Sequence, residues 1–187
     1  KTAVSLEQTG KTNIVVLDKT GTITEGKPKV TDILSRTQED ALLKLALALE
    51  SKSEHPLAKA ILEEGTARGY VPDEVTEFQA LPGNGLHAKL DGKTLLGGSL
   101  QFVSGQVDFP RDMTAKAHAL AEQGKTPLLF AYDGAFAGMI AVADTMKADS
   151  PRAIRELQNM GIQVVMLTGD NERTAKAIGA QAGVDQV

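Results

Sequence analysis

The sequence contains no cysteine and no tryptophan, and aromatic residues make up only 4% of the chain. Without cysteine, the chain can form neither a disulfide scaffold nor a thiolate metal site, and it has no cysteine nucleophile. No apolar run approaches the roughly 18–20 residues needed to cross a bilayer, and the first residues lack a signal-peptide core. The net charge of -4 gives no basic footprint, so we expect no nucleic-acid partner.

The residues that are present fit an ordinary globular protein. The chain has 187 residues, of which 42% are hydrophobic, and this is enough for one or two domains with a real core. It begins at Lys1 without an initiator methionine and stops at Val187, soon after the end of a predicted helix. We therefore expect it to be a piece of a longer protein.

The two ends of the chain carry the signals of a parallel sheet. Residues 13–17 and 163–167 are apolar at nearly every position, which is typical of strands buried on both faces. A helix is predicted over 150–160, with Ser150 as its N-cap, and another over 172–182. This alternation predicts a doubly wound α/β layout with its chemistry at the carboxyl ends of the strands.

The middle of the chain has a different pattern. Helices are predicted over 39–50, 56–68 and 110–123, and short strands are joined by two-residue turns at Asp91-Gly92 and Asp133-Gly134. Helices combined with antiparallel hairpins indicate a separate α+β insert. The predicted domains are therefore a discontinuous α/β domain and an insert, which cover 1–32 with 144–187 and 33–143, respectively.

The pentapeptide Asp18-Lys19-Thr20-Gly21-Thr22 directly follows the first predicted strand. A carboxylate at the carboxyl end of a buried strand is exposed at the edge of the sheet, among backbone N–H groups that can hold phosphate oxygens. Asp18 can attack a phosphoryl group there as a nucleophile, or it can bind Mg²⁺. An isolated Asp-Lys pair more often only caps a turn, but the whole pentapeptide in this context favours chemistry.

The run DKTGTIT at 18–24 resembles the phosphorylation motif of P-type ATPases. The resemblance implies that ATP phosphorylates Asp18, with Lys19 and Thr20 beside the phosphoryl group and its Mg²⁺. Phosphatases of the wider haloacid-dehalogenase-like superfamily place a second Asp two residues after the nucleophile, as general acid/base. Thr20 holds that position here and cannot act as a base near neutral pH. The aspartyl phosphate is therefore expected to persist, which suits a pump and argues against a free-standing phosphatase.

Two further runs match P-type ATPases. Thr168-Gly169-Asp170 matches the TGD motif of the family, and the resemblance implies that Thr168 and Gly169 contact the phosphate. The run Asp144-Thr145-Met146-Lys147 is similar to the hinge stretch of the family, which implies that Asp144 and Lys147 lie near the nucleotide.

A polar turn between the first two helices of the insert contains Glu50 and the run SEHPL at 53–57. Taken alone, His55 is explained as a surface residue with a weak capping role. The run resembles the signature of heavy-metal-transporting P-type ATPases, which implies that His55 stacks on adenine and that Glu50 accepts a hydrogen bond from its exocyclic amine. The same resemblance implies that Gly83 and Gly85 let the nucleotide approach the backbone.

The chain departs from the family pattern in two places. Gly97-Gly98-Ser99 stands where the family usually has Gly-Asn. The chain also stops before the downstream GDGxND motif, whose Asp completes the Mg²⁺ site in the family.

The resemblance covers essentially the whole chain and implies a haloacid-dehalogenase-like fold: an incomplete doubly wound parallel sheet with an inserted α+β nucleotide-binding domain of antiparallel sheet and helices. It implies ATP and Mg²⁺ as cofactors, and a cytoplasmic location beside actuator and transmembrane domains of the same protein. It also implies a transported heavy-metal ion, with Cu⁺ favoured over Zn²⁺ or Cd²⁺. Two alternatives stay open: a nucleotide-binding module without turnover, and a haloacid-dehalogenase-like phosphatase.

Overall fold

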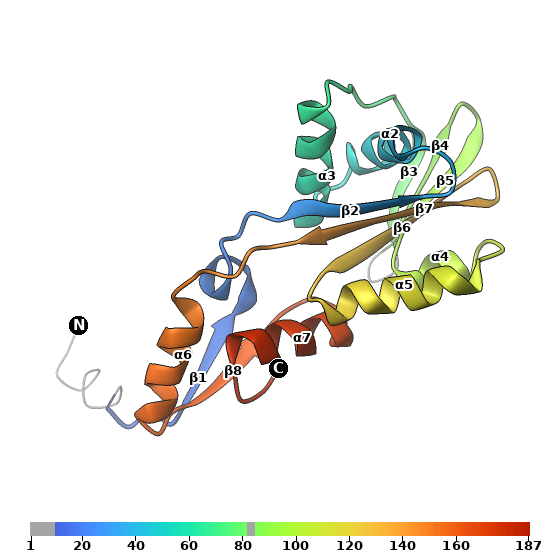
Figure 1. The fold of residues 1–187 in the computed structure, drawn as a ribbon. Helices are drawn as coiled ribbons and strands as arrows, with labels where there is room; N and C mark the ends of the chain where they lie inside the picture. The colour runs from blue at the N-terminus through green and yellow to red at the C-terminus, as the bar shows by residue number, and fades with distance from the viewer. Residues whose placement is uncertain (1–9, 82–84) are drawn as a thin grey trace. The chain divides into compact units, whose positions relative to one another are not determined.

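The computed structural model describes residues 10–81 and 85–187, which fall into two compact units (Figure 1). The discontinuous unit joins the chain up to Lys27 with Asp144–Val187, and the inserted unit is Pro28–Ala143. The sequence boundary was expected after residue 32. In the structure, residues 29–32 already belong to a strand of the inserted unit, because they pair with its neighbouring strand.

The discontinuous unit is built on a pair of parallel strands. Strand β1 (Ile14–Asp18) pairs along its full length with β8 (Gln163–Leu167). Helices α6 (Ser150–Asn159) and α7 (Glu172–Ala182) pack against one face of this pair. The cluster between them contains six buried side chains: Ile23, Ile154, Val164, Met166, Ile178 and Ala182. The predicted α/β class of this part is confirmed.

The expectation that the first strand is buried on both faces is wrong for the described residues. Ile14 and Val16 are 52% and 59% exposed, whereas Val15 and Leu17 are half-buried. The reason is that α6 and α7 share a single cluster on one face of the strand pair. An apolar run indicates which residues need cover, but it does not identify the segment that provides it.

Ser150 was expected to cap α6, and this prediction is also wrong. The N-cap position is Asp149, and Ser150 is the first residue of the helix. Its hydroxyl donates instead to the carbonyl oxygen of Ile23, at 2.8 Å. This bond ties the start of α6 to the turn that follows Asp18.

The inserted unit has one antiparallel sheet of six strands in the order β2-β7-β6-β5-β4-β3. The strands are β2 (Lys29–Ser35), β3 (Thr76–Leu81), β4 (Gly85–Leu90), β5 (Lys93–Gly98), β6 (Thr126–Tyr132) and β7 (Ala135–Ala143). The helices are α2 (Glu39–Glu50), α3 (Pro56–Ala67), α4 (Leu100–Ser104) and α5 (Arg111–Glu122). Sequence reasoning found all of these helices except α4, a single short turn capped by the Ser99 hydroxyl.

Both faces of this sheet are covered by helices (Figure 1). Alternate residues of β7 point to opposite sides, so Ile140 and Val142 pack with α2 and α3, while Met139 and Ala141 pack with α4 and α5. The predicted turns are confirmed: Asp91 and the following glycine have φ of 51° and 74°, as a tight primed hairpin requires.

Candidate functional site

Asp18 is the last residue of β1 and is exposed at the carboxyl end of the parallel pair. Its backbone partner across the pair is Leu167, the last residue of β8. The run Thr168-Gly169-Asp170 therefore begins directly beside Asp18, because parallel strands end at the same edge. The structure thus brings together two motifs that lie about 150 residues apart in the sequence.

Lys19 and Asp170 form an ion pair at this edge. The ammonium nitrogen of Lys19 lies 2.5 Å from Oδ2 of Asp170, and the two side chains are only 11% and 9% exposed. The hydroxyl of Thr168 donates to the same Oδ2 at 2.7 Å, and the backbone N–H of Asp170 donates to Oγ1 of Thr168 at 3.1 Å. Asp170 therefore joins both motifs.

Residues 19–23 form an irregular turn in which Gly21 has a φ of 77°. This left-handed conformation favours glycine, and nothing lies within 4 Å of the position that a Cβ would take. Thr20 is exposed on the same turn. Nζ of Lys147 donates to the carbonyl oxygen of Gly21 at 2.8 Å, so Lys147 holds this turn directly.

Asp144 accepts hydrogen bonds from the residues that follow this turn. Its Oδ2 accepts from the Thr24 hydroxyl at 2.5 Å and from the N–H of Gly26 at 3.1 Å, and its Oδ1 accepts from the N–H of Lys27 at 3.0 Å. These contacts give Asp144 a structural role that sequence reasoning missed, together with its partner Thr24. The available signal was Thr24 itself, the last residue of the run DKTGTIT.

The oxygen atoms at this edge fit part of a Mg²⁺ site. Mg²⁺ is often held by one or two carboxylates together with phosphate oxygens and water. Asp18 and Thr20 are exposed and offer oxygen atoms, whereas the carboxylate of Asp170 forms an ion pair with Lys19. Within the described residues, no group of three or more acidic or histidine side chains could hold a metal ion.

In the inserted unit, Glu50 is the last residue of α2 and is only 5% exposed. Burial raises the pKa of its carboxyl group to about 7, and a hydrogen bond from the Ser53 side chain acts in the opposite direction. Burial therefore favours the protonated form of Glu50 well above the usual pH range of a glutamate.

His55 is the exposed N-cap of α3. The ring Nδ1 of His55 accepts from the backbone N–H of Leu57 at 3.2 Å, and the backbone N–H of His55 donates to Oγ of Ser53 at 3.2 Å. Ser53 therefore connects Glu50 with His55, a link that the sequence did not reveal. The weak capping role considered for His55 is present in the structure.

Gly85, the first residue of β4, has a packing reason to be glycine. A Cβ there would collide with the carbonyl oxygen of Gly97 and the ring of Phe102. The other expected glycine, Gly83, lies outside the described residues.

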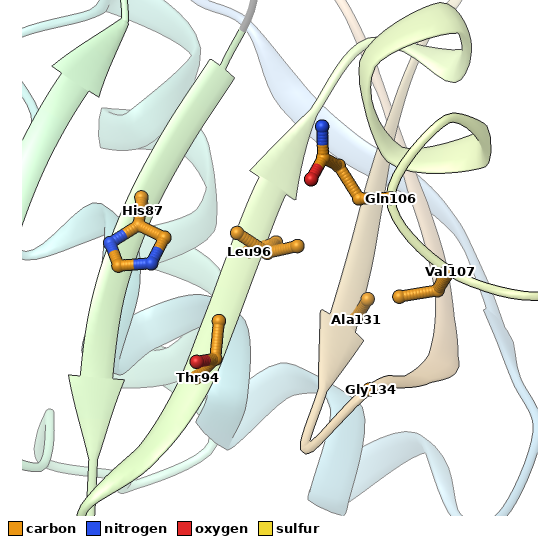
Figure 2. A pocket seen from close by; sticks show the side chains of 7 residues that line it. All are labelled: His87, Thr94, Leu96, Gln106, Val107, Ala131 and Gly134. Carbon is orange, nitrogen blue, oxygen red and sulfur yellow. The ribbon is translucent and has the colours of Figure 1, made fainter.

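A surface hollow of about 280 Å³ lies on the sheet of the inserted unit (Figure 2). Its lining residues are His87, Thr94, Leu96, Gln106, Val107, Ala131 and Gly134. The neighbours of His87 along β4 pack with α2 and α3, so the hollow opens on the opposite face from the helices that carry Glu50 and His55. None of the predicted site residues lines it.

The chain is similar to a group of known proteins. The profile of the haloacid dehalogenase-like hydrolases matches residues 12–187. A copper-transporting P-type ATPase of Rhizobium leguminosarum bv. viciae is 45% identical over 190 residues, covering 100% of this chain and 22% of that protein. The crystal structure of a zinc-transporting PIB-type ATPase is 37% identical with a TM-score of 0.69, covering 100% of this chain and 30% of the other. The N-domain of the copper-transporting P-type ATPase HMA8 is 30% identical with a TM-score of 0.52, covering 60% and 98%.

The chain therefore belongs to the haloacid dehalogenase-like hydrolase family. Within that family, the resemblance predicted from DKTGTIT and SEHPL is confirmed, because the similar proteins are heavy-metal-transporting P-type ATPases. The chain spans 22% of the length of the Rhizobium relative. None of the helices in residues 10–81 and 85–187 has the length and apolar character needed to cross a bilayer.

Proposed function

We propose that this chain is the ATP-binding and phosphoryl-accepting cytoplasmic part of a P-type ATPase that transports a heavy-metal cation. The supporting observation is Asp18, exposed at the end of β1 beside the run Thr168-Gly169-Asp170, with Thr20 in place of a second acid. The similar protein of Rhizobium leguminosarum is a copper-transporting P-type ATPase, which supports Cu⁺ as the cargo.

The proposed reaction starts with ATP held by Glu50, His55, Gly83 and Gly85. A carboxylate oxygen of Asp18 attacks the γ-phosphorus of this ATP. The bond between that phosphorus and the β–γ bridging oxygen breaks, and ADP leaves with the electron pair. The product is an aspartyl phosphate.

The side chains at the strand ends have separate roles in this reaction. Asp18 and Thr20 would hold Mg²⁺, which neutralises phosphate charge when it is bound. Gly169 offers a backbone N–H to the phosphoryl oxygens, whereas the Thr168 hydroxyl, whose one proton is donated to Asp170, would have to rotate to contact them. Because Thr20 cannot take a proton from an attacking water, the aspartyl phosphate persists long enough to drive a conformational change in the longer protein.

Incubation with γ-labelled ATP and Mg²⁺, followed by an acid quench, tests this proposal. The wild-type chain should retain acid-stable label that hydroxylamine releases, because acyl phosphates react with this nucleophile. Asp18→Asn, which keeps the size of the side chain, should retain none. Equal labelling of both chains would show that Asp18 is not the acceptor.

The alternative is a nucleotide-binding module without turnover. It is favoured by the small set of Mg²⁺ ligands, since the described residues hold no cluster of three acidic or histidine groups. ATP binding by a wild-type chain that takes up no label would support this alternative. Rapid hydrolysis of a generic phosphate ester would instead support the phosphatase alternative, and Thr20 leads us to expect none.

A further inference from the structure

We infer that Asp170 is a positioning residue that acts through Lys19: it holds the ammonium group of Lys19 away from the Asp18 carboxylate and so keeps the nucleophile free to meet a phosphoryl group. This inference rests on the proposed function of Asp18. It assigns to Asp170 no contact with the phosphoryl group itself.

Lys19 needs an anionic partner wherever its side chain lies. Its side chain is only 11% exposed, and a buried ammonium group is costly unless it is paired. Two carboxylates are candidates at this edge: Asp18, the preceding residue, and Asp170, which follows the neighbouring strand. The structure pairs Lys19 with Asp170, at 2.5 Å.

Asp170 is itself held in place by its own motif. The Thr168 hydroxyl donates to the carboxylate at 2.7 Å, and the N–H of Asp170 bonds back to that hydroxyl at 3.1 Å. These two bonds, both within the run 168–170, position the carboxylate that pairs with Lys19. Within the described residues, the exposed carboxylate of Asp18 has no ion-pair partner within 4 Å. The charge of Lys19 is thus balanced by Asp170 and not by the nucleophile.

Removal of the negative charge at residue 170 should therefore redirect Lys19. Asp170→Asn keeps an oxygen for the Thr168 hydroxyl but leaves the ammonium group without its partner. A buried charge without a partner moves toward solvent or toward another ion. The adjacent anion is Asp18, and a lysine bound to it would compete with the approach of the γ-phosphoryl group. The expected result is slower phosphoryl transfer with unchanged affinity for ATP.

A double-mutant cycle on the rate of label uptake tests whether Asp170 acts through Lys19. The four chains are the wild type, Asp170→Asn, Lys19→Met and the double variant. Asp170→Asn should lower the rate roughly tenfold when Lys19 is present and have little effect in the Lys19→Met background. If Asp170→Asn lowered the rate of label uptake by the same factor in the wild-type and Lys19→Met backgrounds, the two residues would act independently and the inference would be overturned.

A second measurement does not depend on phosphorylation. The rate at which a water-soluble acylating reagent modifies Lys19, read by peptide mass spectrometry, reports how often the amine leaves its ion pair. Asp170→Asn should raise this rate roughly tenfold, whereas Asp170→Glu, which keeps the charge, should leave it low. Equal rates for Lys19 in the wild type and Asp170→Asn would overturn the inference.

The chain offers a matched control for the acylation experiment. Lys176 pairs with Glu172 on α7, and both side chains are exposed, at 72% and 80%. Glu172→Gln should change the modification of Lys176 by less than about twofold, because exposed ion pairs contribute little. If the wild-type chain takes up no label but Asp170→Asn releases Lys19, the proposed function fails for this chain while the positioning by Asp170 stands.

Discussion

The two units of the chain cover their sheets in different ways. The six antiparallel strands of the inserted unit have helices on both faces, and Leu43, Phe130 and Ile140 are completely buried between them. The two parallel strands of the discontinuous unit have a core on one face, and Ile14 and Val16 on the other face are more than half exposed. Both faces of the inserted sheet are therefore buried, whereas the β1–β8 pair exposes one apolar face and the carboxyl ends of its strands.

The connections differ as well. Tight turns join β4 to β5 and β6 to β7 in the inserted unit, although β2 pairs with β7 from the other end of that unit. Strands β1 and β8 meet only after the chain has passed through the whole inserted unit. Long-range parallel pairing requires a larger loss of chain entropy before contacts form. We therefore expect the inserted unit to be the more stable of the two, whereas the candidate chemistry at Asp18 lies in the other unit. Truncations of equal size should then lower the unfolding free energy of the two units by different amounts. Both tyrosines, Tyr70 and Tyr132, lie in the inserted unit, so tyrosine fluorescence follows that unit alone.

The largest expected contrast comes from leucine truncation in each unit. Leu43→Ala should lower the unfolding free energy of the inserted unit by about 2–5 kcal/mol, because Leu43 is 0% exposed in the core. Leu167→Ala, at a side chain that is 62% exposed, should change the discontinuous unit by less than about 0.5 kcal/mol. Urea unfolding followed by tyrosine fluorescence measures the first, and hydrogen exchange of the β8 amides measures the second. A large loss from Leu167→Ala would break the comparison, because it would show that the outer face is covered in solution.

Glu50 should make the inserted unit less stable as the pH rises. Its pKa is raised by burial from 4.5 to about 7, so the folded state binds the proton more tightly than the unfolded state. The resulting stabilisation is complete below pH 4.5 and is lost as the pH rises to about 7, by about 3 kcal/mol at most. Glu50→Gln should remove this slope and be the more stable chain at pH 8. The unfolding free energies of the two chains, obtained from urea curves between pH 5 and 8, should therefore diverge as the pH rises. The same pH dependence in both chains would show that Glu50 does not have a raised pKa.

The discontinuous unit should show the opposite sign through Asp185. The backbone N–H of Val164 donates to its carboxylate at 2.7 Å and, together with a bond from Gln158, lowers the pKa of Asp185 below its ordinary value of 3.8. Because the pKa is lowered, the ionised carboxylate stabilises the folded state above pH 3.8, and this stabilisation is lost as the pH falls through the pKa of the folded state. Asp185→Asn should therefore weaken the protection of the β8 amides at neutral pH and have a smaller effect at pH 3. A uniform effect at both pH values would contradict this explanation.

Asp144→Asn should destabilise the loop that follows the Asp18 turn. The amide offers one oxygen where the carboxylate accepts three hydrogen bonds from residues 24–27. We expect a loss of about 1–3 kcal/mol in the discontinuous unit, seen as faster exchange of the Gly26 and Lys27 amides. Asp149→Asn is the matched control, since Asp149 is exposed and its side chain makes no capping bond. If the Gly26 and Lys27 amides exchanged at the same rate in both variants, Asp144 would not have this structural role.

The sequence predicted those features of the fold that depend on local pattern. The periodicity of 39–50 and 172–182, the Asp-Gly turns and the two apolar strands each carry their own signal, and the structure confirms them. Short α4 was missed because five residues give no helical period. The exposure of Ile14 was missed because the apolar pattern does not show which segment covers a strand.

The candidate site was predictable in its residues but not in its bonds. DKTGT and TGD were found as motifs, and parallel pairing explains why they meet. Three contacts could not be predicted from the sequence. They are the ion pair of Asp170 with Lys19, the hydrogen bonds of Ser53 with both Glu50 and His55, and those of Asp144 with residues 24–27. Such side-chain contacts depend on where the backbone places each residue, which a linear motif does not encode.

The smallest effect concerns His55, which has a structural and a proposed functional role that two variants separate. Its Nδ1 accepts from the N–H of Leu57 as the N-cap of α3, and asparagine can replace that acceptor whereas alanine cannot. His55→Ala should therefore cost about 1 kcal/mol of stability, while His55→Asn should cost only a few tenths. Both variants lack the ring that would stack on adenine, so calorimetric titration should show ATP binding weakened about tenfold in each. Wild-type affinity in His55→Asn would mean that the ring only caps the helix, and the nucleotide would then have to bind elsewhere in the inserted unit.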